Sequence, residues 1–389
     1  MMTMFSRVLP IVVLTLVSCS HESKGPGDTS DLGTAIEVAD CEEDVEVDEE
    51  DVEVDGTSCT TGRAAPTTII GSVETEGLRL ELIADSPIRV LGEPLAFDLV
   101  LTNIGDTAKQ YFKNELDLDG GAIVIEWLRD ETITEQYCSY GATEWEAPPK
   151  TLAPGESVAR ELHVYWGSVY PDWGYFGCID GAEERLPFGL VGDYSIRLSA
   201  RLRVGDGDGE MSAIDLTTSP ISIQVTQPTG IDNEAWEACL SASHSSSHFN
   251  EPYLFLLWQS GDHLLVGIES WTRIVEEYGG SVFAPYGHFA LGRRWSEPFA
   301  NYETGVVRPA EPALALEQLN EALSGLRCEE TIWRRNTMYW MARMHASLGE
   351  IAAARELVDE IDELYGAEAR NMGGTLQGLD ELRSFLDSQ

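Results

Sequence analysis

The sequence predicts a multidomain α+β protein in which an all-β region is followed by an all-α region. Three observations support this prediction. Between residues 67 and 228, apolar residues alternate with polar ones, which is the period of a half-buried strand. From residue 229 onward they recur at every third and fourth position, as in an amphipathic helix. Ahead of both regions, residues 19–66 are polar and too acidic to build a core.

Residues 1–18 have the features of a secretory signal peptide. Arg7 precedes a mostly apolar run from Val8 to Val17, which is too short to span a bilayer as a helix. The run closes with Leu16-Val17-Ser18-Cys19, which resembles the lipobox of bacterial lipoproteins. This resemblance implies that Cys19 receives a diacylglycerol and becomes the mature N-terminus, so that acyl chains anchor the protein to a lipid bilayer. An ordinary secretory signal that ends in a cysteine by chance is the alternative.

The lipobox resemblance also implies a location. We expect a lipid-anchored protein of the cell envelope. Ser20 stands where retention at the inner membrane would place an aspartate, so the resemblance favours the outer membrane. The sequence leaves open which face of that membrane the protein occupies.

Residues 19–66 are predicted to form an extended acidic tether. Of the 16 positions from Asp40 to Asp55, 11 are acidic and none is basic, a density that cannot bury apolar surface. Valine alternates with acid in this run, so a short duplicated strand or a calcium-responsive segment is an alternative. The formal charge of the whole chain is −42, which repels phosphate, and we therefore expect no nucleic-acid partner.

Six cysteines remain once Cys19 is lipidated, and an even number in an exported chain indicates disulfides. Chain order and the predicted domain limits favour three pairs among the many possible connectivities. These pairs are Cys41 with Cys59, Cys138 with Cys178, and Cys239 with Cys328.

Residues 67–228 contain several apolar runs of period two, separated by turn-forming residues such as Pro154-Gly155-Glu156. Strands with one apolar face each are best buried as two packed sheets. The runs are Leu78, Leu80, Leu82; Leu95, Phe97, Leu99, Leu101; Leu162, Val164, Trp166; Tyr194, Ile196, Leu198, Ala200, Leu202, Val204; and Ile221, Ile223, Val225.

Turn residues beside these runs resemble those of a bacterial immunoglobulin-like β-sandwich. The resemblance rests on Leu91-Gly92-Glu93-Pro94-Leu95 through Asn103, on Thr151–Glu156, and on Val191-Gly192-Asp193-Tyr194. It covers about 160 residues, and it implies a fold rather than an activity.

Residues 229–389 are predicted to be all-α, with an internal repeat offset by 87 residues. The repeat places Gly267 on Ala354, Trp271 on Val358 and Ile274 on Ile361. The second unit resembles a tetratricopeptide repeat. Its first helix would hold Met338, Met341, Ala342 and His345, and its second Ala354, Val358 and Ile361. A generic helical bundle is the alternative, because the first unit departs from the repeat pattern at Phe255.

Two clusters are weak candidates for a metal site. His244 and His248 have the i, i+4 spacing of a zinc site on a helix, although the serines between them favour a polar loop. Asp206, Asp208 and Glu210 bunch carboxylates on a glycine-rich turn, but they lack the further ligands that calcium requires. A hairpin turn explains this second cluster without an ion. We therefore expect no metal and no other cofactor.

Aromatic residues supply the binding candidates. Trp166, Tyr170 and Trp173 crowd a loop-rich stretch that would present rings to a sugar or a protein partner, or would pack as a local core. Trp333, Tyr339 and Trp340 near the second helical unit would line a groove of a helical-repeat domain, or would equally be core.

The sequence contains no nucleophile elbow, P-loop or dinucleotide-binding glycine motif, so nothing points to an enzyme. The predicted function is a membrane-anchored, non-catalytic interaction or scaffolding module with an envelope protein or peptide as its partner. The alternatives are a carbohydrate- or calcium-dependent adhesin that binds through the loops of the β-region, and an envelope hydrolase.

Overall fold

A computed structural model of the chain describes residues 69–116, 122–129, 132–137, 148–164, 191–206, 210–245, 262–300, 307–365, 372–373 and 377–389. The predicted signal peptide, the lipidation residue Cys19 and the acidic tether lie outside these residues. So do Cys41, Cys59, Cys138 and Cys178, and the aromatic candidates Trp166, Tyr170 and Trp173.

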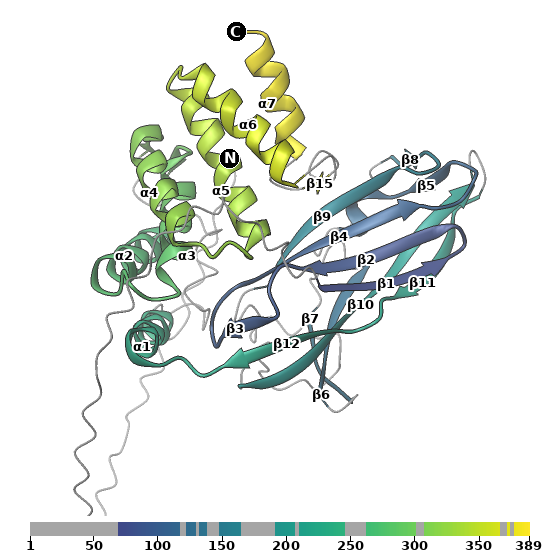
Figure 1. Cartoon of the computed structure of the whole chain (residues 1–389), viewed down its shortest axis with the longest axis horizontal. Coiled ribbons are helices and arrows are strands. Elements are labelled where there is room, and N and C mark those ends of the chain that lie inside the picture. The colour runs from purple at the N-terminus through teal and green to yellow at the C-terminus, as the bar shows by residue number, and fades with distance from the viewer. Residues whose placement is uncertain are drawn as a thin grey trace, which may run out of the picture. The chain divides into compact units, whose positions relative to one another are not determined.

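Strands occupy the first part of the described chain and helices the second, as the colours of Figure 1 show. The mixed α+β class predicted from the sequence is therefore confirmed, with the change from strands to helices between Thr226 and Gly230. The strands of the first part are β1 Ile69–Thr75, β2 Leu78–Ala84, β3 Ile88–Val90, β4 Leu95–Asn103, β5 Lys109–Tyr111, β6 Ile123–Arg129, β7 Thr132–Tyr137, β8 Lys150–Leu152, β9 Ser157–Val164, β10 Gly192–Asp206, β11 Ser212–Thr217 and β12 Ile221–Thr226, with a short 3-10 helix η1 at Lys113–Leu116.

The second part consists of helices with three short strands between them. The helices are α1 Gly230–Ser245, α2 Asp262–Glu277, α3 Ala284–Trp295, α4 Pro312–Gly325, α5 Thr331–Ser347, α6 Ile351–Tyr365 and α7 Gln377–Asp387, and the strands are β13 Phe299–Ala300, β14 Val307–Arg308 and β15 Met372–Gly373. Each helix contacts the next one in the chain. Among the helices that the structure describes, none combines the length and the apolar character needed to cross a membrane.

The strands form two main sheets. The first has the order β1-β2-β4-β9-β15. The second has the order β3-β12-β10-β5-β8, with β11 and β6 also paired to the long strand β10 and β7 paired to β6. Leucines of the first sheet and isoleucines of the second belong to one hydrophobic cluster, so the two sheets share a core.

The period-two runs of the sequence account for this core. In the runs on β2, β4, β10 and β12 the alternating apolar side chains are buried, as predicted. Strand β4 differs from the others because all of its nine residues are buried. Its second face, which carries Ala96, Asp98 and Val100, is covered by the helices, because Ala96 and Val100 belong to the hydrophobic cluster of the helical region.

Both helices of the second predicted unit are present, whereas Phe255 of the first unit lies outside the described residues. Ala342 of α5 and Ala354 of α6 are fully buried between these neighbouring helices, and Val358 and Ile361 lie in the same core. Trp271 and Ile274, which the repeat places on a helix, are buried on α2. The predicted polar loop from Ser243 to His248 is wrong at its start. Helix α1 continues through Ser245, because serine is tolerated in the last turn of a helix.

Two further contacts join the helical region to the sheets. Strand β15 pairs in parallel with β9, Met372 lying opposite Ala159, and so it occupies the edge of the first sheet. Trp236 of α1 packs directly over Gly92, which has a left-handed φ of 92° in the turn between β3 and β4. A Cβ atom on Gly92 would lie 2.2 Å from Cζ3 of Trp236, so this close approach requires glycine.

The predicted disulfide between Cys239 and Cys328 stays a prediction. Cys239 lies in the core on α1. Cys328 belongs to the exposed turn between α4 and α5, and its sulfur is in a disulfide.

Candidate functional site: a buried charged junction

Five charged side chains and one tyrosine gather where the helices meet the sheets, all but Arg327 buried, and we call this group the junction. Its members come from the β2–β4 segment, from α3 and from the turn between α4 and α5. They are Asp85, Arg89, Glu93, Tyr286, Arg327 and Glu330. Buried charges are costly unless they are paired, so the pairing within the junction decides what the junction can do.

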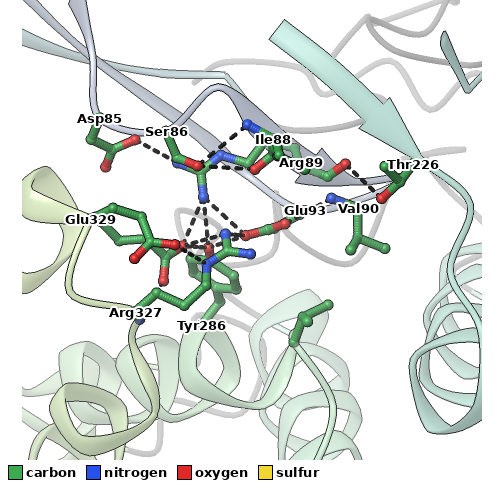
Figure 2. A network of polar contacts seen from close by, with 12 residues as sticks. Asp85, Ser86, Ile88, Arg89, Val90, Glu93, Thr226, Tyr286, Arg327 and Glu329 are labelled. Atoms are coloured by element: carbon green, nitrogen blue, oxygen red, sulfur yellow. Dashed lines mark hydrogen bonds and ion pairs between the residues drawn. The ribbon is translucent and has the colours of Figure 1, made fainter. Parts of the chain in front are cut away.

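Arg89 of β3 is the centre of the junction (Figure 2). Its side chain is 1% exposed, and its two Nη atoms contact three carboxylates. Nη2 lies 2.5 Å from Asp85 Oδ1, while Nη1 lies 2.9 Å from Glu93 Oε1 and 2.7 Å from Glu330 Oε1. Because Glu330 precedes α5, one guanidinium group connects the sheet region to the helical region.

Arg327 and Tyr286 complete the pairing on the helical side. Arg327 forms ion pairs with Glu93 and Glu330 and is about one-third exposed. The hydroxyl group of Tyr286 lies between the same two carboxylates, 2.7 Å from Glu93 Oε1 and in contact with Glu330. Figure 2 shows the two guanidinium groups directed at this one group of oxygens.

The local backbone explains why Glu93 lies here. Its amide donates to the carbonyl of Val90 at 2.9 Å, which closes the turn that contains Gly92. Its carboxylate accepts a hydrogen bond from the amide of Val90 at 2.8 Å, so the side chain folds back over its own turn. The turn therefore places the carboxylate of Glu93 beside Arg89, which lies four residues earlier in the chain.

The surroundings shift the pKa values of the acids in different directions. Burial raises the pKa of Asp85 to about 6; Arg89 opposes this shift, and Glu330 and Asp98 add to it. Burial also raises the pKa of Glu93. Burial acts in the same direction on Glu330, but Arg89 and Arg327 outweigh it and hold the pKa of this carboxyl below its usual value. Burial raises the pKa of Tyr286 well above its ordinary value, so its hydroxyl stays a neutral donor.

A second buried ion pair lies beside the junction and connects α5 to β4. Arg335 contacts Asp98 with both Nη atoms, at 3.0 and 2.8 Å, and it also lies 3.4 Å from Glu161. Asn336 donates to Glu161 as well. This bidentate geometry is the strong form of an arginine–carboxylate pair. It explains how a carboxylate can lie on the buried outer face of β4.

The charged groups of the junction mainly neutralise one another. The carboxylates of the junction are paired with arginines, and Tyr286 is held as a donor to the same oxygens. Within the described chain, no group of three or more His, Cys, Asp or Glu side chains is arranged to hold a metal ion. The arrangement can hold two regions together, and it can respond to protons.

An open groove lies away from the junction, along α6. Its volume is about 910 Å³, and its described lining is acidic with apolar side chains at both ends. The lining residues are Ile351, Ala352, Arg355, Glu356, Asp359, Glu360, Glu363 and Leu364. The four acids recur at helical spacing, which places them on one side of α6.

The sequence-predicted metal candidates are not brought together as a site. Asp206 ends β10 and forms an ion pair with Lys109 at 2.6 Å. Strands β10 and β11 pair as an antiparallel hairpin around this turn, which confirms the hairpin interpretation. Glu210 is exposed, and Asp208 lies outside the described residues. His244 is in the last turn of α1, and His248 lies outside the described residues.

The aromatic candidates of the helical region are core residues. Trp333, Tyr339 and Trp340 are at most 4% exposed, so they do not line an exposed groove. Trp333 packs edge-on against Tyr286 and Phe289, at ring distances of 5.2 and 5.3 Å. The hypothesis that these three residues bind a partner is therefore wrong, and the core alternative is correct.

No residue of the junction was predicted from the sequence as a site residue. Asp85, Arg89 and Glu93 are spaced by four, which is the signature of ion pairs on one helix face. Pro87, Gly92 and Pro94 argue against a helix there, so the spacing did not predict ion pairs between these residues. One feature of the sequence could have indicated the junction. Three charged residues lie in a short segment rich in proline and glycine, directly between two strongly apolar strands.

Comparisons with known proteins add little. No family model matches the sequence, and no curated protein matches it. Among solved structures, the crystal structure of the C-terminal domain of wzt is similar to part of the chain, with 14% identity and a TM-score of 0.23. The match covers 41% of this chain and 80% of that domain. A TM-score this low carries no argument about either fold or function.

Proposed function

We propose that the protein is a lipid-anchored, non-catalytic interaction module of the cell envelope, whose α6 groove receives a basic segment of an envelope protein or peptide. The observation that carries this proposal is the groove of about 910 Å³ along α6, lined by four carboxylates and bounded by Ile351, Ala352 and Leu364. Carboxylates attract a basic partner, and the apolar residues supply contact area. No cofactor is needed.

The described structure supports a module of two joined parts. The shared core of the two sheets is compatible with an immunoglobulin-like sandwich, and the α5–α6 pair with a tetratricopeptide-like unit. The junction and the contacts of β4 join these parts, which would present α6 at a defined place on the module. The lipobox resemblance at Leu16–Cys19 supplies the proposed anchor. Position 20 holds serine rather than aspartate, which favours the outer membrane.

Removal of the anchor residue is expected to release the protein from the membrane. Cys19→Ala should abolish incorporation of radiolabelled palmitate, and the chain should move from the membrane fraction to the soluble fraction, because no acyl chain remains to partition into the bilayer. Cys239→Ala removes a cysteine from α1 and is the matched control, which should keep both label and location. Persistent labelling of Cys19→Ala would contradict lipidation at this residue.

Neutralisation of the groove is expected to abolish partner binding. The variant Glu356→Gln, Asp359→Asn, Glu360→Gln, Glu363→Gln keeps the shape of α6 and removes four negative charges. Affinity purification from detergent-solubilised envelope should recover a stoichiometric partner with the wild-type chain and at least about tenfold less with this variant. Recovery should also fall as salt is raised.

The matched control for this variant lies on a different helix. Glu317→Gln with Glu321→Gln removes exposed acids from α4, and recovery should be unchanged. Equal loss with both variants would show that net charge, rather than the α6 groove, attracts the partner. No partner with the wild-type chain, in repeated experiments, would argue against an interaction module.

A further inference from the structure

We propose that the junction is an acid-responsive latch, in which proton uptake at Asp85 strengthens the packing of the helices on the sheets. This inference concerns the regulation of the junction, and it does not depend on the proposed anchor or on the α6 groove. It rests on how the charges of the junction are distributed.

The first observation is an imbalance of charge. Three carboxylates, those of Asp85, Glu93 and Glu330, share two guanidinium groups, those of Arg89 and Arg327. The junction therefore carries one more negative than positive charge when all of its acids are ionised. Such an excess in a buried site favours the uptake of one proton.

The second observation is that the imbalance falls on Asp85. Glu93 and Glu330 each contact both arginines and the hydroxyl of Tyr286. Within the described chain, Asp85 forms its ion pair with Arg89 and also accepts a hydrogen bond from the backbone of Ile332. It is 3% exposed, so water compensates its charge poorly. Of the three acids, Asp85 contacts the fewest guanidinium groups.

The charged groups that act on Asp85 are Arg89 of β3, Asp98 of β4 and Glu330 before α5, and the backbone of Ile332 on α5 hydrogen-bonds to it. The other titratable groups around it act through these: Glu93, Tyr286 and Arg327 contact Arg89 or Glu330, and Arg335 pairs with Asp98. Asp98 adds to the negative potential at Asp85, although Arg335 pairs with it in a bidentate manner. Glu330 adds further negative potential from the helical side.

Protonation of Asp85 would remove the excess negative charge of the junction. When Asp85 becomes neutral, Arg89 no longer divides its charge among three carboxylates, and it pairs more strongly with Glu93 and Glu330. Glu330 belongs to the helical side, so the connection between helices and sheets becomes tighter. The pKa of about 6 for Asp85 places this change just below neutral pH.

The sign of the pH effect follows from linkage. The pKa of Asp85 is raised in the folded state, from 3.8 to about 6, so the folded state binds the proton first. Its contribution to stability is complete below the unfolded pKa and is lost as pH rises through the folded pKa. Between pH 7.5 and pH 5, Asp85 alone should increase the folding equilibrium constant by about tenfold. Glu93, whose pKa is also raised, acts in the same direction as Asp85, and Glu330, whose pKa is lowered, acts in the opposite direction at more acid pH.

The experiment compares the full-length chain in detergent with Asp85→Asn, which removes the titration and keeps the shape. Urea unfolding at pH 7.5 and pH 5 should give a ratio of folding constants that is about tenfold larger for the wild-type chain than for Asp85→Asn. Asp215→Asn is the matched control, because Asp215 is an exposed acid in a loose pair with Arg201. This control should keep the wild-type ratio. Equal ratios for wild type and Asp85→Asn would overturn the proposal.

Amide hydrogen exchange of the wild-type chain tests the same proposal without a variant. After correction for intrinsic exchange rates, residues 85–93 and 327–333 should be protected about tenfold more at pH 5 than at pH 7.5. Residues 194–204 of β10, in the core of the sheets, serve as the internal reference. No gain of protection at the junction over this reference would also overturn the proposal.

Discussion

Arg89→Met is expected to destabilise the protein by about 3–5 kcal/mol, which is the cost of removing one partner from a buried ion pair. Methionine fills much of the space of the arginine stem, so the loss is electrostatic rather than a cavity. Asp85, Glu93 and Glu330 would stay buried with only the half-buried Arg327 to compensate them. Urea unfolding followed by tryptophan fluorescence measures the effect.

Two further variants show whether charge is the cause. Arg201→Met removes an arginine from an exposed pair with Asp215, where N and O are 3.8 Å apart, and it should change stability by no more than about 0.5 kcal/mol. Adding Asp85→Asn and Glu93→Gln to Arg89→Met removes the uncompensated charges, so more than half of the lost stability should return. A loss below about 1 kcal/mol for Arg89→Met would show that the junction contributes little.

Gly92→Ala is expected to destabilise the protein by about 3 kcal/mol, for two reasons that add. The residue has a left-handed φ of 92°, which alanine adopts with strain. Its new methyl group would lie 2.2 Å from the ring of Trp236, so α1 or the turn must move. The turn also positions Glu93, and its movement would disturb the junction. Thermal unfolding and the exchange rates of the α1 amides report both consequences.

Gly155→Ala separates the two reasons. Gly155 also has a left-handed φ, of 77°, but a Cβ atom there would have no neighbour within 4 Å. This control should therefore lose only the backbone contribution, about 1 kcal/mol. If the two variants lose equal stability, the contact between Trp236 and Gly92 has no energetic importance.

The sheets were the part of the fold best predicted from the sequence. Leu78, Leu80 and Leu82 alternate with polar residues, and the structure buries all three in the core of the sheets. The same reasoning fails on β4, because alternation indicates one apolar face and says nothing about what covers the other. Asp98 on that second face is buried, since its partner Arg335 is on a helix far away in the sequence.

The helices were predicted from the spacing of apolar residues and from small residues at close contacts. The elements against which these helices pack were not predicted. Ala342 and Ala354 correctly indicated the close approach of two neighbouring helices. The rings of Trp333 and Trp340 gave an ambiguous signal, because an aromatic residue suits both a core and a binding surface. Packing against α3, through Tyr286 and Phe289, decides the question for Trp333.

The junction could not be predicted, because its parts lie far apart in the chain. Arg89 and Glu330 are separated by 241 residues, and no local rule relates them. A single sequence shows that each residue is charged, but burial of the charge is a tertiary property. The carboxylates around Asp206 are a local feature by contrast, and the turn residues between two apolar runs were enough to predict the hairpin that contains Asp206.

The outer face of β4 has a consequence for the order in which the protein matures. A ribosome makes Asp98 first and its partner Arg335 237 residues later. During that interval the strand can form its ladder, but water must solvate the carboxylate, and Ala96 and Val100 have no cover. The nascent sheets therefore reach their final state only after the last third of the chain has been synthesised. A polypeptide that ended after β12 would expose the outer face of β4, and its apolar residues would favour association with other chains.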